Sequence, residues 1–211
     1  MRMNKIKSKK VRDTKLAPPI YQDYIKKEKS WIKKKIKHTS SLIDVGCGEG
    51  RAVSFLSKLT DSYMGVDFDS KAISKAKKLE NKKIKFKILD VTKLSDYFSR
   101  NSFEISVCLW NTIGNIENDE RAIKEMYKIT SKRCFITTLK KGNVKERIHY
   151  YNSYKINYKL DKRNEIFYSD AWGIARAYSR GDFKTLCRNV GFKVVSTVDL
   201  GKIGFGVELK K

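Results

Sequence analysis

The sequence predicts an α/β protein built on a mostly parallel sheet, and two observations carry this prediction. Strand-like and helix-like segments alternate strictly from residue 41 to residue 139, as they do where helices cover both faces of a parallel sheet. A glycine-rich turn, LIDVGCGEGR at residues 42–51, joins the first strand of this alternation to its helix. With 211 residues, 40% of them hydrophobic, the chain can bury one sizeable core.

The alternating segments are expected in a fixed order. A first helix begins at Tyr21 and carries its apolar residues on one face, with lysines opposite. Short apolar runs bounded by turns predict strands at residues 41–46, 62–68, 83–91, 103–110 and 133–139. Apolar residues at helical spacing predict helices between them, at residues 51–59, 70–80 and 117–130.

Regular structure returns at the end of the chain, after an irregular stretch at residues 140–178. Ser179 is a good N-cap for a helix that Gly191 ends. Two strands follow, at residues 192–200 and 202–210, joined by a turn at Gly201.

The net charge of +24 is distributed unevenly along the chain. Residues 1–37 hold 14 Lys and Arg against 3 acids, residues 38–120 hold 12 of each kind, and residues 121–211 hold 21 against 8. One interpretation is a surface for an anionic partner such as RNA. The other is a lysine-rich composition, because Lys outnumbers Arg 36 to 11 and nucleic-acid recognition favours Arg.

The domain organisation follows from this charge and from two prolines. Residues 1–17 are polar and basic and precede Pro18-Pro19, so we expect a flexible tail. A single domain is expected over residues 18–211, with residues 140–178 inserted in it.

Several classes of protein are disfavoured. No apolar run reaches the roughly 18–20 residues of a membrane span, and MRMNKIKSKK has no apolar stretch behind its charges, so no secretory signal is expected. The four cysteines lack CxxC spacing and the chain has two histidines. We therefore expect buried thiols, no metal, and a cytoplasmic protein.

The glycine-rich turn at residues 46–50 has the spacing GxGxG. Glycines between a strand and a helix let a ligand approach bare backbone and the helix N-terminus, which indicates a nucleotide-like ligand. The dinucleotide fingerprint GxGxxG would need a glycine at position 51, where the chain has Arg51. A nicotinamide oxidoreductase is therefore disfavoured, and a ligand without a pyrophosphate is favoured.

Three acids, Asp44, Asp67 and Asp90, fall at the carboxyl ends of successive predicted strands. A single acid in such a place usually caps a helix or charges a loop, but three in succession indicate a ligand. Asp67 is placed for the two hydroxyls of a ribose, and Asp90 with the Val91 amide is placed for an adenine edge.

The segments LIDVGCGEGR, GVDFDSKAISKAK and KILDV, together with the final pair of strands, resemble the class I S-adenosylmethionine-dependent methyltransferases over residues 41–211. The resemblance implies a Rossmann-like three-layer sandwich. Its seven-stranded sheet would have the order 3-2-1-4-5-7-6, with the last strand antiparallel. It also implies S-adenosylmethionine as cofactor, S-adenosylhomocysteine as product, and no metal.

The same resemblance implies roles for individual residues. Asp44 would order the glycine loop, Asp67 would hold the ribose, and Arg51 either reaches the cofactor carboxylate or begins a surface helix. The full set of expected cofactor contacts is Asp44, Gly46, Cys47, Gly48, Gly50, Arg51, Asp67, Phe68, Asp90, Val91, Trp110 and Tyr24. Cys47 is expected to be a small filler. Tyr24 lies on the first helix, which would cover the sulfonium, and simple docking of that helix is the preferred alternative.

The acceptor site is expected beside the end of the fourth strand, at WNTIGNI (110–116). This stretch lacks the proline of the Asn/Asp-Pro-Pro-aromatic tetrad of many nucleic-acid amino-methyltransferases. It is similar to the asparagine-containing loop of glycine and sarcosine N-methyltransferases, with Asn111 at the matching position. Alternatively, Asn111 and Thr112 only cap the loop.

The insertion at residues 140–178 is expected to form a substrate lid, because aromatic residues alternate there with lysines and arginines. These rings would stack bases of RNA or cage an amine, and some would simply pack a hairpin of residues 155–160 and 164–170. Of the residues in this insertion, Trp172 and Arg176 are the ones most expected to face the cofactor. His149 is the one histidine placed to act as a base, with a packing role as the alternative.

These observations predict a methyltransferase acting on a small-molecule acceptor, at nitrogen, with Asn111, His149, Trp172 and Arg176 in the catalytic set. A tRNA or rRNA methyltransferase that uses the basic ends of the chain is the first alternative. A non-catalytic subunit that binds the cofactor is the second.

Overall fold

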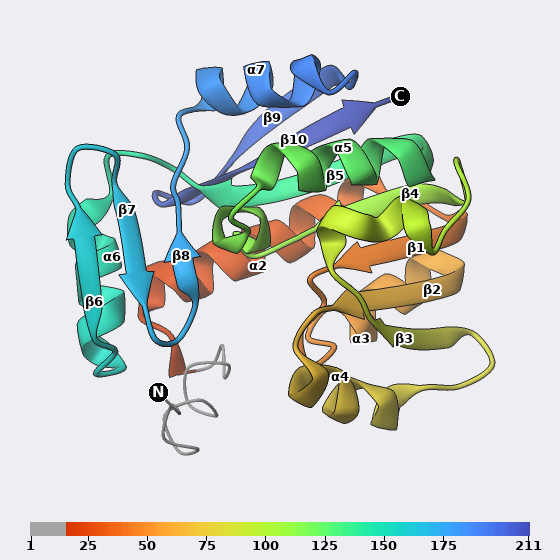
Figure 1. Cartoon of the computed structure of the whole chain (residues 1–211), viewed down its shortest axis with the longest axis horizontal. Helices are drawn as coiled ribbons and strands as arrows, with labels where there is room; N and C mark the ends of the chain where they lie inside the picture. The colour runs from red at the N-terminus through yellow and green to blue at the C-terminus, as the bar shows by residue number, and fades with distance from the viewer. Residues whose placement is uncertain (1–15) are drawn as a thin grey trace.

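The computed structural model describes residues 16–211 (Figure 1). Residues 1–15 of the predicted basic tail lie outside the described residues. The rest of the chain contains a seven-stranded sheet with the order β3-β2-β1-β4-β5-β10-β9. Its strands are β1 (Thr39–Val45), β2 (Thr60–Asp67), β3 (Ile84–Ile88), β4 (Phe103–Cys108), β5 (Thr130–Leu139), β9 (Lys193–Leu200) and β10 (Gly204–Lys210).

This topology confirms the predicted strand order. Strands β3, β2, β1, β4 and β5 pair in parallel, and β10 pairs antiparallel with both β5 and β9. The carboxyl ends of the five parallel strands therefore meet at one edge, where ligands bind in open α/β sheets.

Helices cover both faces of the sheet (Figure 1). The α-helices of this domain are α2 (Pro19–Lys35), α3 (Val53–Leu56), α4 (Ser70–Ala76), α5 (Asp119–Ile129) and α7 (Arg180–Asn189). Short 3-10 helices are η2 (Ser57–Leu59), η3 (Lys77–Leu79), η4 (Val91–Asp96) and η5 (Thr112–Asn115). Apolar residues of α2, α3 and α4 pack on one face, and those of α5 and α7 pack on the other.

The insertion folds as a small unit beside the carboxyl edge of the sheet (Figure 1). It contains the helix α6 (Val144–Ser153) and an antiparallel three-stranded sheet of β6 (Tyr158–Asp161), β7 (Ile166–Ser169) and β8 (Gly173–Ala175). The predicted hairpin is confirmed, because β6 pairs with β7 around a turn in which the Asp161 carboxylate accepts from the Asn164 amide. We call residues 140–178 the lid.

Local structure differs from the predicted boundaries in three places. The helix expected at 51–59 is reduced to α3 and η2, because the turn that Gly50 closes with a φ of 84° delays the start of the helix. The third strand ends at Ile88, since Asp90 caps η4 by accepting from the Thr92 amide at 2.9 Å. Helix α6 and strand β8 were not predicted.

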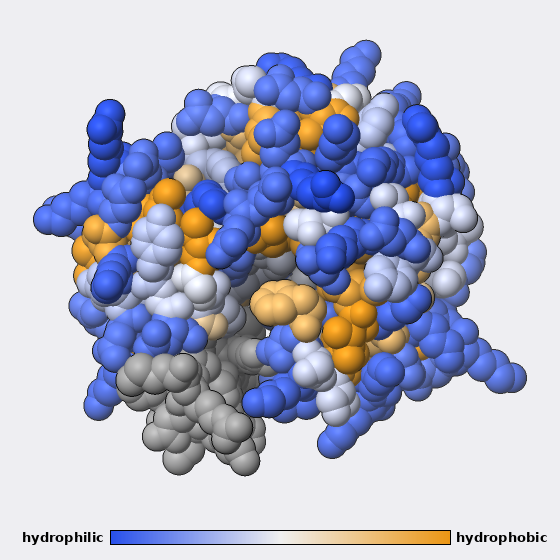
Figure 2. Space-filling model, viewed as in Figure 1, coloured by the Kyte–Doolittle hydropathy of each residue, from blue (hydrophilic) through white to orange (hydrophobic). Residues whose placement is uncertain are grey.

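Much of the surface is hydrophilic, as Figure 2 shows for one face. Of the helices described, none is both long and apolar enough to cross a bilayer.

Candidate active site

The glycine loop after β1 leaves bare backbone at the carboxyl edge of the sheet. Gly46, Gly48 and Gly50 have φ values of 72°, 56° and 84°, a region that L side chains rarely adopt. A Cβ on Gly46 would lie 2.1 Å from the Thr112 side chain, whereas a Cβ on Gly48 would meet nothing within 4 Å. Packing against Thr112 therefore explains why position 46 is a glycine, and the open space at Gly48 is available to a ligand.

Asp67, at the end of β2, is linked to this loop. Its Oδ2 accepts from the Gly48 amide at 2.8 Å and its Oδ1 accepts from the Asp69 amide at 2.9 Å. The carboxylate stays partly exposed with lone pairs to spare. Phe68, the next residue, has 80% of its surface exposed, which leaves an apolar face beside the carboxylate.

Asp44 lies beneath the glycine loop and is buried. Its Oδ2 accepts from the Tyr63 hydroxyl at 2.8 Å. Burial raises the pKa of Asp44 from 3.8 to about 7, since the low-dielectric surroundings disfavour the carboxylate. Cys47 packs in the loop as a buried thiol and contacts no other cysteine.

Asp90 and Val91 lie at the expected edge of the sheet, where Asp90 is the N-cap of η4 and Val91 is its first residue. Asp90 is exposed, and its Oδ1 accepts from both the amide and the hydroxyl of Thr92. Their contact with an adenine stays a prediction.

Helix α2 supplies a residue that sequence reasoning missed. Glu28 is 1% exposed, and its Oε1 accepts from the Trp110 amide at 2.7 Å and from the Thr137 hydroxyl at 2.5 Å. Its Oε2 accepts from both terminal nitrogens of Arg51 at 3.3 Å. Arg51 also stacks 5.0 Å over the Trp110 ring. The sequence does contain a signal for Glu28: this acid lies at helical spacing on the same face as the apolar residues Tyr21, Tyr24 and Trp31.

The loop after β4 is held in an uncommon conformation. Trp110 and Asn111 are consecutive residues with φ values of 58° and 57°. Asn111 is buried, and its Oδ1 accepts from the Thr138 hydroxyl at 2.7 Å and from the Leu139 amide at 2.9 Å. Its Nδ2 donates to the Arg176 carbonyl at 3.2 Å. Asn111 thus braces β5 and the lid as well as facing the cavity described next.

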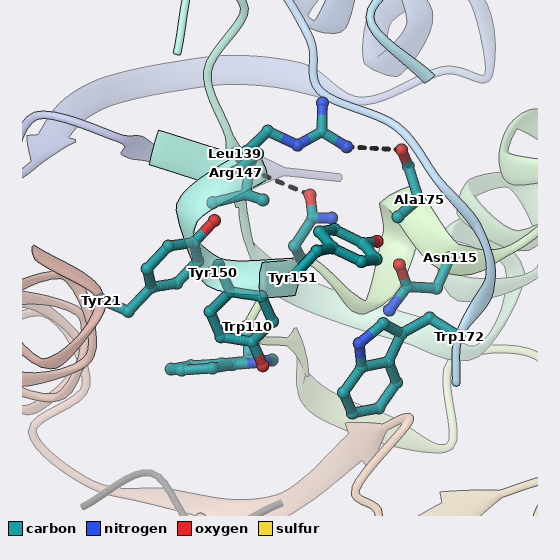
Figure 3. Close-up of a pocket in the computed structure, with 10 residues that line it drawn as sticks. Tyr21, Trp110, Asn115, Leu139, Arg147, Tyr150, Tyr151, Trp172 and Ala175 are labelled. Atoms are coloured by element: carbon teal, nitrogen blue, oxygen red, sulfur yellow. Dashed lines mark hydrogen bonds between the residues drawn. The ribbon is translucent and has the colours of Figure 1, made fainter. Parts of the chain in front are cut away.

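A cavity of about 50 Å³ lies between α2, the β4 loop and the lid (Figure 3). Half of its lining residues are aromatic: Tyr21, Tyr150 and Trp110 gather on one side, and Trp172 lies on the other. Its lining is Tyr21, Trp110, Asn111, Asn115, Leu139, Arg147, Tyr150, Tyr151, Trp172 and Ala175.

Two of the predicted catalytic residues line this cavity and two do not. Asn111 and Trp172 are in its wall. His149 is exposed on α6. Arg176 instead holds the β4 loop, because its terminal nitrogens donate to the carbonyls of Ile116 at 2.5 Å and Glu117 at 3.0 Å.

Tyr24, the predicted cofactor contact on α2, is buried against Gly204 and lies 5.9 Å from the Trp110 ring, centroid to centroid. This position fits the docking alternative for the first helix.

Comparison with known proteins shows which proteins the chain is similar to. Residues 42–133 match the model of a family described as a methyltransferase domain. An S-adenosylmethionine-dependent methyltransferase from Aquifex aeolicus has a TM-score of 0.68 at 18% identity, with 99% of each chain covered. The PH0226 protein from Pyrococcus horikoshii has a TM-score of 0.73 at 17% identity, with 93% of each chain covered. No curated protein matches by sequence.

The seven-stranded sheet has the Rossmann-like fold of the solved S-adenosylmethionine-dependent methyltransferases. Residues 42–133, which include the glycine loop, are in addition similar to the methyltransferase domain.

The residues present fit this cofactor. Open space at Gly48 admits a ligand to backbone, and the exposed Phe68 ring gives a base a surface to lie on. The Asp67 carboxylate is the acceptor that sugar hydroxyls need.

Proposed function

We propose that this chain transfers a methyl group from S-adenosylmethionine to a small acceptor held in the cavity beside the β4 loop. The observation that carries the proposal is the size and position of that cavity. About 50 Å³ suits a group of a few heavy atoms, and Trp110 at the end of β4 belongs to its wall. Nitrogen as the accepting atom rests on the resemblance of residues 110–116 to the N-methyltransferase loop.

The cofactor, when bound, supplies a methyl group already activated on a sulfonium. The residues proposed to hold it are the glycine loop, Asp67 and Phe68, with Asp90 and Val91 toward the base. Asp44 and Cys47 support the loop from below, and Arg51, held by Glu28, stacks on the Trp110 ring.

The chain's own part in transfer is alignment and exclusion of water. The rings of the lid and of α2 enclose the acceptor, which raises its effective concentration and keeps water from the reacting methyl. Burial raises the pKa of Tyr21 and Tyr150 well above the usual tyrosine value, so both remain hydroxyl donors. With His149 exposed, we assign no residue of the cavity as a general base.

The test is methyl transfer by the purified chain with labelled S-adenosylmethionine. Total RNA and a pool of small cellular metabolites are offered separately, each at low and high salt. Label in the metabolite pool that does not change with salt supports the proposal. Label only in RNA that fades as salt rises contradicts it and favours a nucleic-acid methyltransferase. Cofactor binding without transfer to either pool would favour a non-catalytic subunit.

A further inference from the structure

Among residues 16–211, Arg147 is the largest fully buried side chain, with 1% of its surface exposed, and it lines the acceptor cavity. It lies on α6, on the same face as Tyr150 and Tyr151. A buried arginine normally meets a carboxylate, because an unpaired charge in a low-dielectric interior is costly.

The charge of Arg147 has no such partner in the part of the chain described. Its terminal nitrogens donate to the backbone carbonyls of Glu165 and Ala175, both at 2.6 Å, and its guanidinium stacks 4.3 Å over the Phe167 ring. Neither contact neutralises the charge. Its Nε, also buried, has no hydrogen-bond partner. The Glu165 carboxylate affects the pKa of Arg147 but accepts from the Gly142 amide.

The rest of the cavity wall contains hydrogen-bond donors and no acid. None of its lining residues is Asp or Glu. Within residues 16–211, the hydroxyls of Tyr21 and Tyr150 make no hydrogen bond, and both residues line the cavity. Of the other acids of the lid, Asp161 accepts from Asn164 at the hairpin turn and Asp170 is exposed. Glu146 acts electrostatically on Tyr21, but its carboxylate is paired with Lys202 and does not line the cavity. The cationic amine expected as one alternative thus meets no carboxylate in the cavity wall.

We propose that the acceptor carries an oxyanion, a carboxylate or a phosphate, held near Arg147 with the Tyr21 hydroxyl donating to it. This inference rests on the proposed function, since it names the chemical class of the acceptor in that cavity. The carbonyl contacts of Arg147 also fasten α6 to the lid sheet, so the test must separate charge recognition from a structural role.

The first experiment uses the metabolite pool in three forms with the wild-type chain and labelled S-adenosylmethionine. One portion is untreated, one has its carboxylates amidated with carbodiimide and excess ethanolamine, and one has its phosphates removed by phosphatase. We expect one of the two treatments to abolish labelling, which also tells carboxylate from phosphate. Labelling that survives both treatments overturns the inference while leaving the proposed function intact. Absence of label from every portion overturns the proposed function itself, and this inference with it.

The second experiment asks whether Arg147 supplies the charge. We expect R147M to lower kcat/KM for the untreated pool by on the order of 30-fold or more, with cofactor affinity within about twofold of wild type. R147K, which keeps the charge, should retain more activity than R147M. R163M is the matched control, because Arg163 is an exposed arginine of the same lid and its loss should change nothing.

A matched pair of small probes separates charge from structure. If the first experiment identifies a carboxylate, acetate should compete with the acceptor of the wild-type chain, whereas acetamide, of nearly the same shape, should not. If it identifies a phosphate, inorganic phosphate takes the place of acetate and trimethyl phosphate is its neutral counterpart. R147M should lose this discrimination, which a merely structural arginine would not affect. If the anion and its neutral counterpart inhibit the wild type equally, Arg147 does not recognise an anion.

Discussion

At the scale of single residues, Asp67 serves two purposes. It holds the Gly48 amide and is proposed to bind the cofactor ribose. We expect D67A to weaken cofactor binding by about 1–3 kcal/mol, because it removes a charged acceptor and loosens the loop. Calorimetry with S-adenosylmethionine measures this. D61A, at an exposed acid that pairs with His38, is the control, and unchanged binding by D67A would refute the ribose assignment.

Asn111 illustrates how one residue combines backbone and side-chain roles. The sequence predicts an acceptor residue, and the structure adds two buried hydrogen bonds and a φ of 57°. We expect N111A to lower the free energy of unfolding by about 2–4 kcal/mol, from the lost hydrogen bonds and the strained φ. N111G removes the same side chain but tolerates this φ, so it should lose about 1 kcal/mol less. Urea unfolding compares them, and equal losses would show that the φ carries no strain.

At the scale of elements, Glu28 joins helix α2 to the β4 loop and to Arg51. Removing it would leave the Arg51 guanidinium without its carboxylate partner, and the Trp110 amide with the Thr137 hydroxyl as its remaining acceptor. We therefore expect E28A to destabilise the chain by about 3–5 kcal/mol. E28Q should keep the bond from the Trp110 amide but lose the ion pair, and so should lose less. Thermal unfolding of both variants, beside E80Q at an exposed glutamate, provides the measurement. A loss from E28A no larger than from E80Q would mean that α2 is fastened by its apolar face alone.

Asp44, at the end of β1, should make the folding stability of the chain depend on pH. The pKa of Asp44 is raised from 3.8 to about 7 in the folded chain, so the folded state binds a proton that the unfolded state releases between these values. This contribution to stability is present below pH 4 and is lost as the pH rises toward 7. Acids whose pKa is lowered, such as Glu104 and Asp199, act in the opposite direction.

The comparison that isolates Asp44 is wild type against D44N, which keeps an oxygen for the Tyr63 hydroxyl but cannot ionise. We expect the stability of wild type relative to D44N to fall by a few kcal/mol between pH 5 and pH 8. Chemical unfolding at each pH measures it. A difference that does not vary with pH would show that Asp44 titrates near its usual value.

At the scale of the whole molecule, the net charge of +24 opposes compaction. Many acids are already paired, for example Glu208 with Lys35 and Arg133, so the remaining excess of lysines repels itself. We expect sodium chloride at 0.5 M to raise Tm by about 2–4 °C for each kcal/mol of repulsion that it screens. Scanning calorimetry in a salt series tests this. A Tm that falls or stays constant would show that the lysines are too widely spaced to repel.

The fold was predictable from local patterns because its elements are set by local chemistry. The alternation of strands and helices, the GxGxG turn and the Ser179 cap each depend on neighbouring residues, and the structure bears them out. The lid was predicted less well, since α6 is a short helix of weak apolar periodicity that depends on contact with α2 and β8.

The site divides in the same way. Acids at strand ends predict the edge proposed for the cofactor, because parallel strands bring their carboxyl ends together whatever the rest of the chain does. Glu28 and Arg147 could not be assigned in this manner. Each is an ordinary charged residue in a lysine-rich sequence, and its meaning comes from partners 82 and 28 residues away.

The sequence by itself therefore determined the α/β fold class through its periodicity. Its resemblance to a known family predicted the order of the strands, and its glycine spacing and strand-end acids predicted the edge proposed for a cofactor. Only the tertiary structure decided which side chains are buried together. It turned His149 outward, engaged Arg176 with the β4 loop, and placed an arginine without a carboxylate partner in the wall of the acceptor cavity. The physical reason is that the cost of burying a charge depends on what surrounds it, and long-range packing alone sets those surroundings.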